Sequence, residues 1–142
     1  MKKGLLVIIF TALSTFFISA QAYNKTQLDQ FEKTNKCNKC DLSSAVITWN
    51  HSGAELNDAN LSNISFRNKH GGNFALASLK NANLSGAHLV NSNLSHADLT
   101  GTHLDAAHLY MTNIYGAIGA DFSNADICMA TLPDGSQGKC SY

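Results

Sequence analysis

Two histidines and four cysteines are the residues of this 142-residue chain whose spacing could support chemistry. His88 and His108 lie twenty residues apart at equivalent positions of a sequence repeat, and imidazole nitrogens are common ligands of transition metals. Cys37 and Cys40 form a CxxC pair, a spacing found in redox centres, in zinc sites and in structural disulfides. Which of these applies depends on the elements that carry the residues.

Residues 77–114 repeat a five-residue pattern eight times, in which a small residue precedes a large aliphatic one by two positions, as in Ala82-Asn83-Leu84. On an α-helix this period places successive leucines about 140° apart, and in a long strand it places them on alternate faces. A chain that turns a corner every five residues satisfies the pattern, because each short extended side then points its small residue and its leucine inward. The repeat therefore predicts a β-solenoid.

The repeats resemble the pentapeptide-repeat family, whose signature is Ala-(Asp/Asn)-Leu followed by two small or polar residues, as in Ala97-Asp98-Leu99-Thr100-Gly101. The resemblance covers most of the chain after its N-terminal apolar segment. It implies an all-β fold, a right-handed quadrilateral β-helix of about four coils with four pentapeptides per coil. Positions twenty residues apart should then stack on neighbouring coils, about 4.8 Å from each other.

With this stacking, His88 and His108 lie one above the other, close enough to share a metal ion, and His103 lies around the corner. No carboxylate or cysteine is expected beside them, so we assign no metal and keep a weak surface site at His88 and His108 as an alternative. The repeat supplies Ser, His and Asp at every corner, and no catalytic set can be distinguished from it. The family is largely non-enzymatic, so we expect a non-catalytic protein without a cofactor.

Residues 1–22 are typical of a secretory signal peptide. Lys2 and Lys3 form a basic start, an apolar stretch follows, and Ala20-Gln21-Ala22 matches a cleavage site. The alternative is a membrane anchor, but the apolar stretch is shorter than the ~20 residues a spanning helix needs. We therefore expect bacterial export to the periplasm or outside the cell, with no stable membrane span after cleavage.

The charge balance limits the possible partners. Without Lys2 and Lys3 the chain has eight Lys and Arg against ten Asp and Glu, a net charge of −2. A nearly neutral surface argues against a nucleic-acid binder and against a densely charged mimic of nucleic acid. We expect a scaffold or protein-binding module for an unidentified protein or envelope component. The alternative is a nucleic-acid mimic that binds a DNA-processing enzyme, as in family members that protect DNA gyrase.

Residues 24–35 predict a short helix, with Thr26 as its N-cap, Asp29 three residues later, and Leu28 and Phe31 on one face. A solenoid exposes core residues and strand edges at its ends, so we interpret residues 23–41 as an N-terminal helical cap with the CxxC segment. The alternative is a partner-binding helix.

The four cysteines allow three pairings. Cys37-Asn38-Lys39-Cys40 resembles the CxxC segment that precedes the repeats of exported pentapeptide-repeat proteins, and the run from Cys128 through Pro-Asp-Gly resembles their C-terminus. About four stacked coils separate the two pairs by about 20 Å, too far for a disulfide. The resemblance therefore implies the disulfides Cys37–Cys40 and Cys128–Cys140, which suit an oxidising compartment.

Large central residues continue the repeat over residues 42–132, and residues 133–142 form the tail closed by the second disulfide. Eight residues instead of five separate Phe66 from Phe74, and again Ile114 from Phe122. We interpret both gaps as three-residue insertions at corners, in the loops 67–73 and 115–121, where a function could be added to the scaffold. This count predicts a stack of Leu61, Leu84, Leu104 and Ile127.

Overall fold

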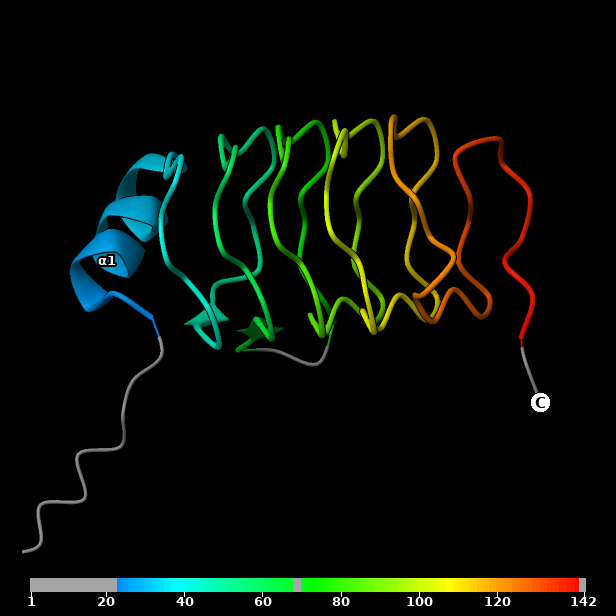
Figure 1. Ribbon diagram of the computed structural model, residues 1–142, viewed down its shortest axis with the longest axis horizontal. Coiled ribbons are helices and arrows are strands. Elements are labelled where there is room, and N and C mark those ends of the chain that lie inside the picture. The colour runs from blue at the N-terminus through cyan, green and yellow to red at the C-terminus, as the bar shows by residue number, and fades with distance from the viewer. Residues whose placement is uncertain (1–22, 68–69, 141–142) are drawn as a thin grey trace, which may run out of the picture.

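The computed structural model describes residues 23–67 and 70–140. Its elements are α1 (Lys25–Thr34), β1 (Val46–Ile47) and β2 (Ser65–Phe66), and β1 and β2 pair in parallel. Most of the chain forms an elongated stack of coils, with α1 at one end and the C-terminal residues at the other (Figure 1). The signal peptide predicted for residues 1–22, residues 68–69 of the first predicted loop and residues 141–142 of the tail lie outside the described residues.

Parallel bridges between successive coils define the shape of one coil. Four of them follow one another at five-residue intervals and join residues twenty positions apart, namely Asn73↔Asn93, Ser78↔Asp98, Asn83↔His103 and His88↔His108. The next bridge, Asn93↔Asn113, starts a new coil where the first bridge ended. One coil therefore has four sides of five residues, as the resemblance implied.

The interior of the stack is filled by the aliphatic residues of the repeat. The central leucines are at most 1% exposed in successive repeats, at Leu79, Leu84, Leu89, Leu94 and Leu99. The small residues two positions earlier are buried beside them, and the residues between the two point outward. This result confirms the inward orientation predicted from the period of five, and it leaves no room for a second large side chain on each side.

The corners require a left-handed backbone at one residue in five. From residue 76 to residue 116, φ at these corners lies between 54° and 70°, at Leu76, Asn81, Gly86, Asn91, His96, Gly101, Ala106, Met111 and Gly116. Glycine adopts this conformation without strain, and asparagine tolerates it. Neither property applies to Leu76, Ala106 or Met111, so the left-handed backbone at each of these three residues costs about 1–2 kcal/mol of conformational strain.

The coils differ in length. The first bridges join residues 19 positions apart, as in Asp41↔Asn60, and the next join residues 23 apart, as in Asn60↔Asn83. The bridges of the following coils join residues 20 positions apart, as in Asn83↔His103. The three additional residues lie between Phe66 and Phe74, so the insertion predicted in the loop 67–73 is confirmed.

The second insertion, predicted in the loop 115–121, is wrong. Asp98↔Ile118 keeps the spacing of 20, but His108↔Asp126 has a spacing of only 18, so the last coil is two residues shorter. Ile127 consequently follows Leu109 in its stack, not Leu104 as predicted. The corner is shortened at Gly119, whose φ is 77° and where a Cβ would lie 2.5 Å from Thr100 Oγ1. Only a glycine permits this close approach.

Helix α1 lies across the first coil. Its N-cap is Asn24, whose side chain accepts a hydrogen bond from Gln27 N. The prediction that Thr26 is the N-cap is therefore wrong. The predicted apolar face is confirmed, because Leu28 and Phe31 are buried. The helix ends at Asn35, which has a left-handed backbone and donates its N–H to Phe31 O.

Two disulfides are present in the described part of the chain. Cys37–Cys40 follows α1 and has a Cα–Cα distance of 5.5 Å, and Cys128–Cys140 closes the tail with a Cα–Cα distance of 4.3 Å. Across residues 23–67 and 70–140, no helix is long and apolar enough to cross a membrane.

Candidate binding surfaces

The outer faces place the predicted histidine pair as expected. The rings of His88 and His108 are stacked, with centroids 5.0 Å apart and planes inclined by 11°. His103 lies on a neighbouring side, where it pairs with Asn83. No carboxylate was predicted beside the pair, but the shortened last coil brings Asp126 into register with His108.

Asp126 does not complete a metal site. One of its carboxylate oxygens, Oδ1, accepts a hydrogen bond from Cys128 N at 3.1 Å. Among the residues that the structure describes, no group of three or more His, Cys, Asp and Glu side chains is arranged to hold a metal ion. The two histidines and Asp126 therefore form a polar strip on one outer face.

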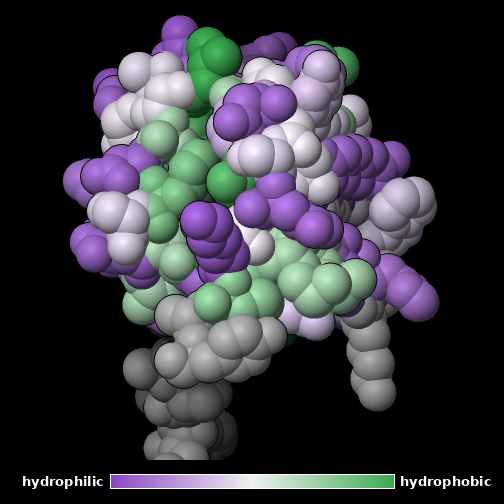
Figure 2. Space-filling model, turned by 90° about the vertical axis from the view of Figure 1, so that its right-hand side faces the viewer, coloured by the Kyte–Doolittle hydropathy of each residue, from purple (hydrophilic) through white to green (hydrophobic). Residues whose placement is uncertain are grey.

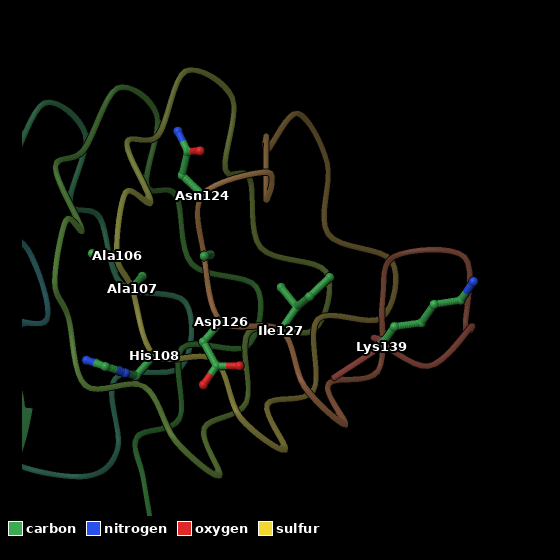
Figure 3. Close-up of a pocket in the computed structure, with 8 residues that line it drawn as sticks. Ala106, Ala107, His108, Asn124, Asp126, Ile127 and Lys139 are labelled. Atoms are coloured by element: carbon green, nitrogen blue, oxygen red, sulfur yellow. The ribbon is translucent and has the colours of Figure 1, made fainter. Parts of the chain in front are cut away.

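A shallow pocket of about 380 Å³ lies beside this strip, at the C-terminal end of the stack. Its polar side chains come from consecutive coils and from the tail, namely His108, Asn124, Asp126 and Lys139, and its floor contains alanines and Ile127 (Figure 3). Lys139 is the basic group of the pocket. The pocket is part of a larger surface, because the last coil, which contributes Asn124, Asp126 and Ile127 to it, has no further coil stacked on it within the described residues.

The last coil leaves part of the core uncovered. Its inward side chains Phe122, Ile127 and Leu132 are only partly buried, whereas their counterparts in the inner coils are almost fully buried. The tail covers one side through Thr131↔Gln137, and through hydrogen bonds from Met129 N to Gly138 O and from Gly138 N to Ala130 O.

On the neighbouring side of the last coil, two backbone groups lack the hydrogen bonds that their counterparts in the preceding coil make, as far as the described residues extend. In the preceding coil, Leu109 N donates to Asp126 O and Ala107 O accepts from Asp126 N. The equivalent groups of the last coil, Ile127 N and Ala125 O, have no such partner within residues 23–67 and 70–140. Unpaired strand edges of this kind can pair with another chain.

Exposed apolar side chains surround this end of the stack. They are 36–58% exposed and comprise Tyr110, Met111, Tyr115, Ile118 and Met129. Figure 2 looks onto this end and shows hydrophobic surface between polar groups. We call the last coil, residues 117–132, together with these side chains the C-terminal end surface.

The C-terminal end surface is acidic. Asp121 and Asp126 lie in the last coil and Asp134 directly follows it, whereas Lys139 is the one lysine or arginine among residues 117–140. Hydrogen bonds from the backbone and hydroxyl of Ser123 lower the pKa of Asp121, and those from Ser136 lower the pKa of Asp134. Both carboxylates therefore stay ionised at neutral and mildly acidic pH.

His51 is a buried polar residue whose inward position was not predicted from the sequence. It occupies an inward position of the first coil, in the stack that continues with Phe74, and its side chain is 3% exposed. Burial lowers the pKa of His51, and the nearby Glu32 carboxylate opposes this shift. A spacing of four from Ile47 and five to Leu56 was the only sequence signal of its inward position.

Four-sided coils of five-residue sides, with leucines inside and polar residues outside, define a solenoid of five-residue repeats. Residues 73–113 match the family model described as pentapeptide repeats, in eight copies. This match and the similarity to HetL reported below support the pentapeptide-repeat family, and no enzymatic family is found. A comparison with curated proteins finds no significant match.

Solved structures of other pentapeptide-repeat proteins are similar to the chain. HetL, a pentapeptide repeat protein involved in heterocyst differentiation regulation in the cyanobacterium Nostoc sp. strain PCC 7120, is 28% identical with a TM-score of 0.56, over 72% of this chain and 53% of HetL. This chain thus spans about half the length of HetL. A pentapeptide repeat protein of the Arabidopsis thaliana thylakoid lumen is 22% identical, with a TM-score of 0.42 over 73% of this chain and 70% of that one. Rfr23 of the cyanobacterium Cyanothece 51142 is 22% identical, with a TM-score of 0.39 over 74% and 82%.

Proposed function

We propose that this chain is an exported, non-catalytic pentapeptide-repeat module that binds a protein in the periplasm or outside the cell. The signal-like residues 1–22 support export, and two disulfides are typical of an oxidising compartment. In this proposal the chain is the exported type of repeat protein, with its CxxC segment before the coils and its Pro-Asp-Gly tail after them. Helix α1 is the N-terminal cap of about four coils.

The C-terminal end surface is the observation that carries this proposal. It combines partly buried core residues, exposed apolar side chains and the groups Ile127 N and Ala125 O, which have no backbone partner among the described residues. Solenoids usually cover such an end, because it exposes core residues and strand edges to water. A partner that covers it gains both apolar contact and backbone hydrogen bonds.

The charge of this surface indicates the chemistry of the partner. Asp121, Asp126 and Asp134 lie in or beside the last coil, with Lys139 as the basic side chain there. Complementary charges favour partners of opposite sign and reject those of the same sign. The partner segment therefore presents apolar side chains flanked by lysine or arginine. A second copy docked through the same end is disfavoured, because it would bring two acidic surfaces together.

Site-specific photo-cross-linking in cells tests the surface. A photoreactive amino acid at Ile118, which is 58% exposed at the C-terminal end, should cross-link to the partner. The matched control is Leu76, which is 67% exposed but lies in an inner coil. Mass spectrometry should identify a cross-linked segment with basic residues beside apolar ones. Equal cross-linking from both positions, or none from Ile118, contradicts the proposed surface.

Two further measurements test the proposed binding surface and the proposed cellular location separately. With the identified partner purified, Ile118→Asp should weaken binding at least tenfold by adding like charge and removing apolar contact, while Leu76→Asp leaves it unchanged. Unchanged binding by Ile118→Asp excludes this surface. Cell fractionation tests export independently, since a cytoplasmic protein that retains residues 1–22 contradicts the location and reopens binding to a DNA-processing enzyme.

A further inference from the structure

The hydrogen bonds of the inner coils show what the open side of the last coil, residues 125–127, can bind. The outward residue of each side uses both of its backbone groups toward the preceding coil. His108 N donates to Ala87 O, and His108 O accepts from Leu89 N. Asp126 repeats this arrangement one coil later. A single extended residue therefore joins each coil to the one before it on this side.

The last coil offers the same two groups to a further residue. Ala125 O and Ile127 N have no backbone hydrogen-bond partner within residues 23–67 and 70–140. The pocket of about 380 Å³ lies at this side, with Ile127 in its floor (Figure 3). One extended residue of another chain, running parallel to residues 125–127, can donate its N–H to Ala125 O and accept from Ile127 N.

We propose that the partner docks as an extended segment that adds a parallel strand to this side, with one residue, its central residue, opposite Asp126. This inference rests on the proposed binding function and specifies how the partner binds. The N–H and C=O of the central residue both point toward the last coil. Those of its two neighbours point away from the coil, because backbone groups alternate in direction along a strand.

The central residue is lysine or arginine. Its side chain extends an outward column that runs through His88, His108 and Asp126. Asp126 is exposed and makes no ion pair within the described residues, and its Oδ1 accepts a hydrogen bond from Cys128 N. Lys139, the basic side chain of the pocket, points away from Asp126 (Figure 3). A basic side chain stacked above Asp126, at the inter-strand spacing of about 4.8 Å, can pair with its free oxygen.

The core determines the two neighbours of the central residue. The residue after it lies over Ile127, which is only partly buried, whereas Leu89 and Leu109 in the same column are fully buried. A large aliphatic side chain at this position covers Ile127 and continues the stack. The residue before it lies over Ala125 and Ala107, where the narrow interior favours a small side chain. The segment therefore has the order small, basic, aliphatic.

A second copy of this chain does not supply such a segment. Its first coil is covered by α1, whose Phe31 packs on the core. Among the outward residues that form bridges in the described part of the chain, Lys36 is the one lysine or arginine, and it already pairs with Glu55. The segment therefore comes from a different protein.

Peptide binding followed by NMR tests the register. The probe is a peptide with blocked ends, Gly-Ser-Ala-Lys-Leu-Ser-Gly, added at millimolar concentration to the mature protein. The amide signals of residues 125–127 should shift, and hydrogen exchange of Ile127 N should slow because this N–H gains an acceptor. N-methylation of the lysine removes the N–H that donates to Ala125 O and should weaken binding about tenfold. N-methylation of the leucine is the matched control and should leave binding unchanged, because that N–H points away from the coil.

Asp126→Asn tests the charge of the central residue. Asparagine keeps an acceptor for Cys128 N but has no charge. The original protein should bind the lysine peptide about threefold more tightly than the same peptide with glutamine. Asp126→Asn should bind both equally, whereas Asp98→Asn, at an outward aspartate of an inner coil, should retain the preference. A preference that survives in Asp126→Asn contradicts the proposed register.

Two further results would overturn the proposal. One is equal binding of the two N-methylated peptides, and the other is the absence of shifts at residues 125–127 at millimolar peptide. The cross-link from Ile118 separates these failures from a failure of the proposed function, because it requires a partner at the C-terminal end surface but no strand pairing. Cross-linking at Ile118 without peptide binding at residues 125–127 rejects strand addition alone. Loss of the cross-link rejects the surface itself.

Discussion

The two ends of the stack are closed in different ways. At the N-terminal end, α1 places Phe31 on the core, and a polar network of Glu32, Asn35 and Thr48 surrounds His51. At the C-terminal end, a disulfide-closed tail covers one side, and Ile127 on the next side remains partly exposed. The N-terminal end is thus closed by the packing of a helix, and the C-terminal end by a cross-linked tail. The tail covers only part of the last coil.

The largest expected effect concerns the inner coils on which both ends rest. Leu94→Lys should prevent folding, because it buries an unpaired charge in an interior without space for it. The total stability of a domain of this size is about 5–15 kcal/mol, so the loss is decisive. Asn93→Lys, one position away and pointing outward, should be nearly silent. Equal melting temperatures for the two variants would contradict the inward orientation of the leucines.

The difference between the two ends predicts that replacing a core side chain by alanine destabilises the protein more at the N-terminal end than at the C-terminal end. Phe31→Ala should lower the free energy of unfolding by about 3–5 kcal/mol, because Phe31 is fully buried. Ile127→Ala should cost less than about 2 kcal/mol, because Ile127 is only partly buried. Chemical denaturation of both variants measures the difference. A larger cost at Ile127 would mean that the C-terminal end is covered in solution.

The two disulfides provide a second test of the difference between the two ends of the stack. Cys128–Cys140 spans twelve residues and should contribute about 3 kcal/mol in the chain-entropy model, against about 2 kcal/mol for the three-residue span of Cys37–Cys40. The double variant Cys128→Ser, Cys140→Ser should therefore melt earlier than Cys37→Ser, Cys40→Ser. Under reducing conditions, hydrogen exchange should rise first in the last coil. A first rise in the first coil would reverse the roles assigned to the ends.

The smallest expected effect is at a corner near the C-terminal end. Ala106→Gly should raise the free energy of unfolding by about 0.5 kcal/mol, because it relieves a left-handed alanine but also increases the entropy of the unfolded chain. Gly101→Ala is the opposite control. Its φ is 70° and a Cβ would lie 2.3 Å from Asn81 Oδ1, so it should destabilise the protein. Both shifts can be measured by thermal denaturation, and a destabilised Ala106→Gly would mean that the corner is unstrained.

The sequence predicted the coils well because their period leaves few alternatives. A period of five with one small and one large residue is compatible with neither a helix nor a long strand. The stacking of Leu61, Leu84 and Leu104 was predicted from the four pentapeptides per coil that the family resemblance implied. The disulfide partners and the buried face of α1 could also be anticipated. In each case a local pattern constrained the structure.

The two eight-residue gaps show where this reasoning failed. Between Phe66 and Phe74 the chain inserts three residues at a corner, whereas between Ile114 and Phe122 it turns at Gly119 and the coil loses two residues instead. Spacing alone cannot distinguish the two cases, because both leave eight residues between successive large central residues. The inward position of His51 was not anticipated, because a polar residue there interrupts the hydrophobic pattern that locates the core.

The unequal coil lengths also bear on how the chain finds its structure. In an array of identical repeats, a coil can pair with the wrong neighbour at little cost, and such pairings trap folding chains. Here successive spacings of 19, 23, 20 and 18 residues mean that a shift by one coil misplaces the corners and moves outward residues inward. The irregular corners therefore disfavour slipped pairings and leave each coil one matching neighbour on either side, so that the native order of coils has a free-energy gap over its alternatives.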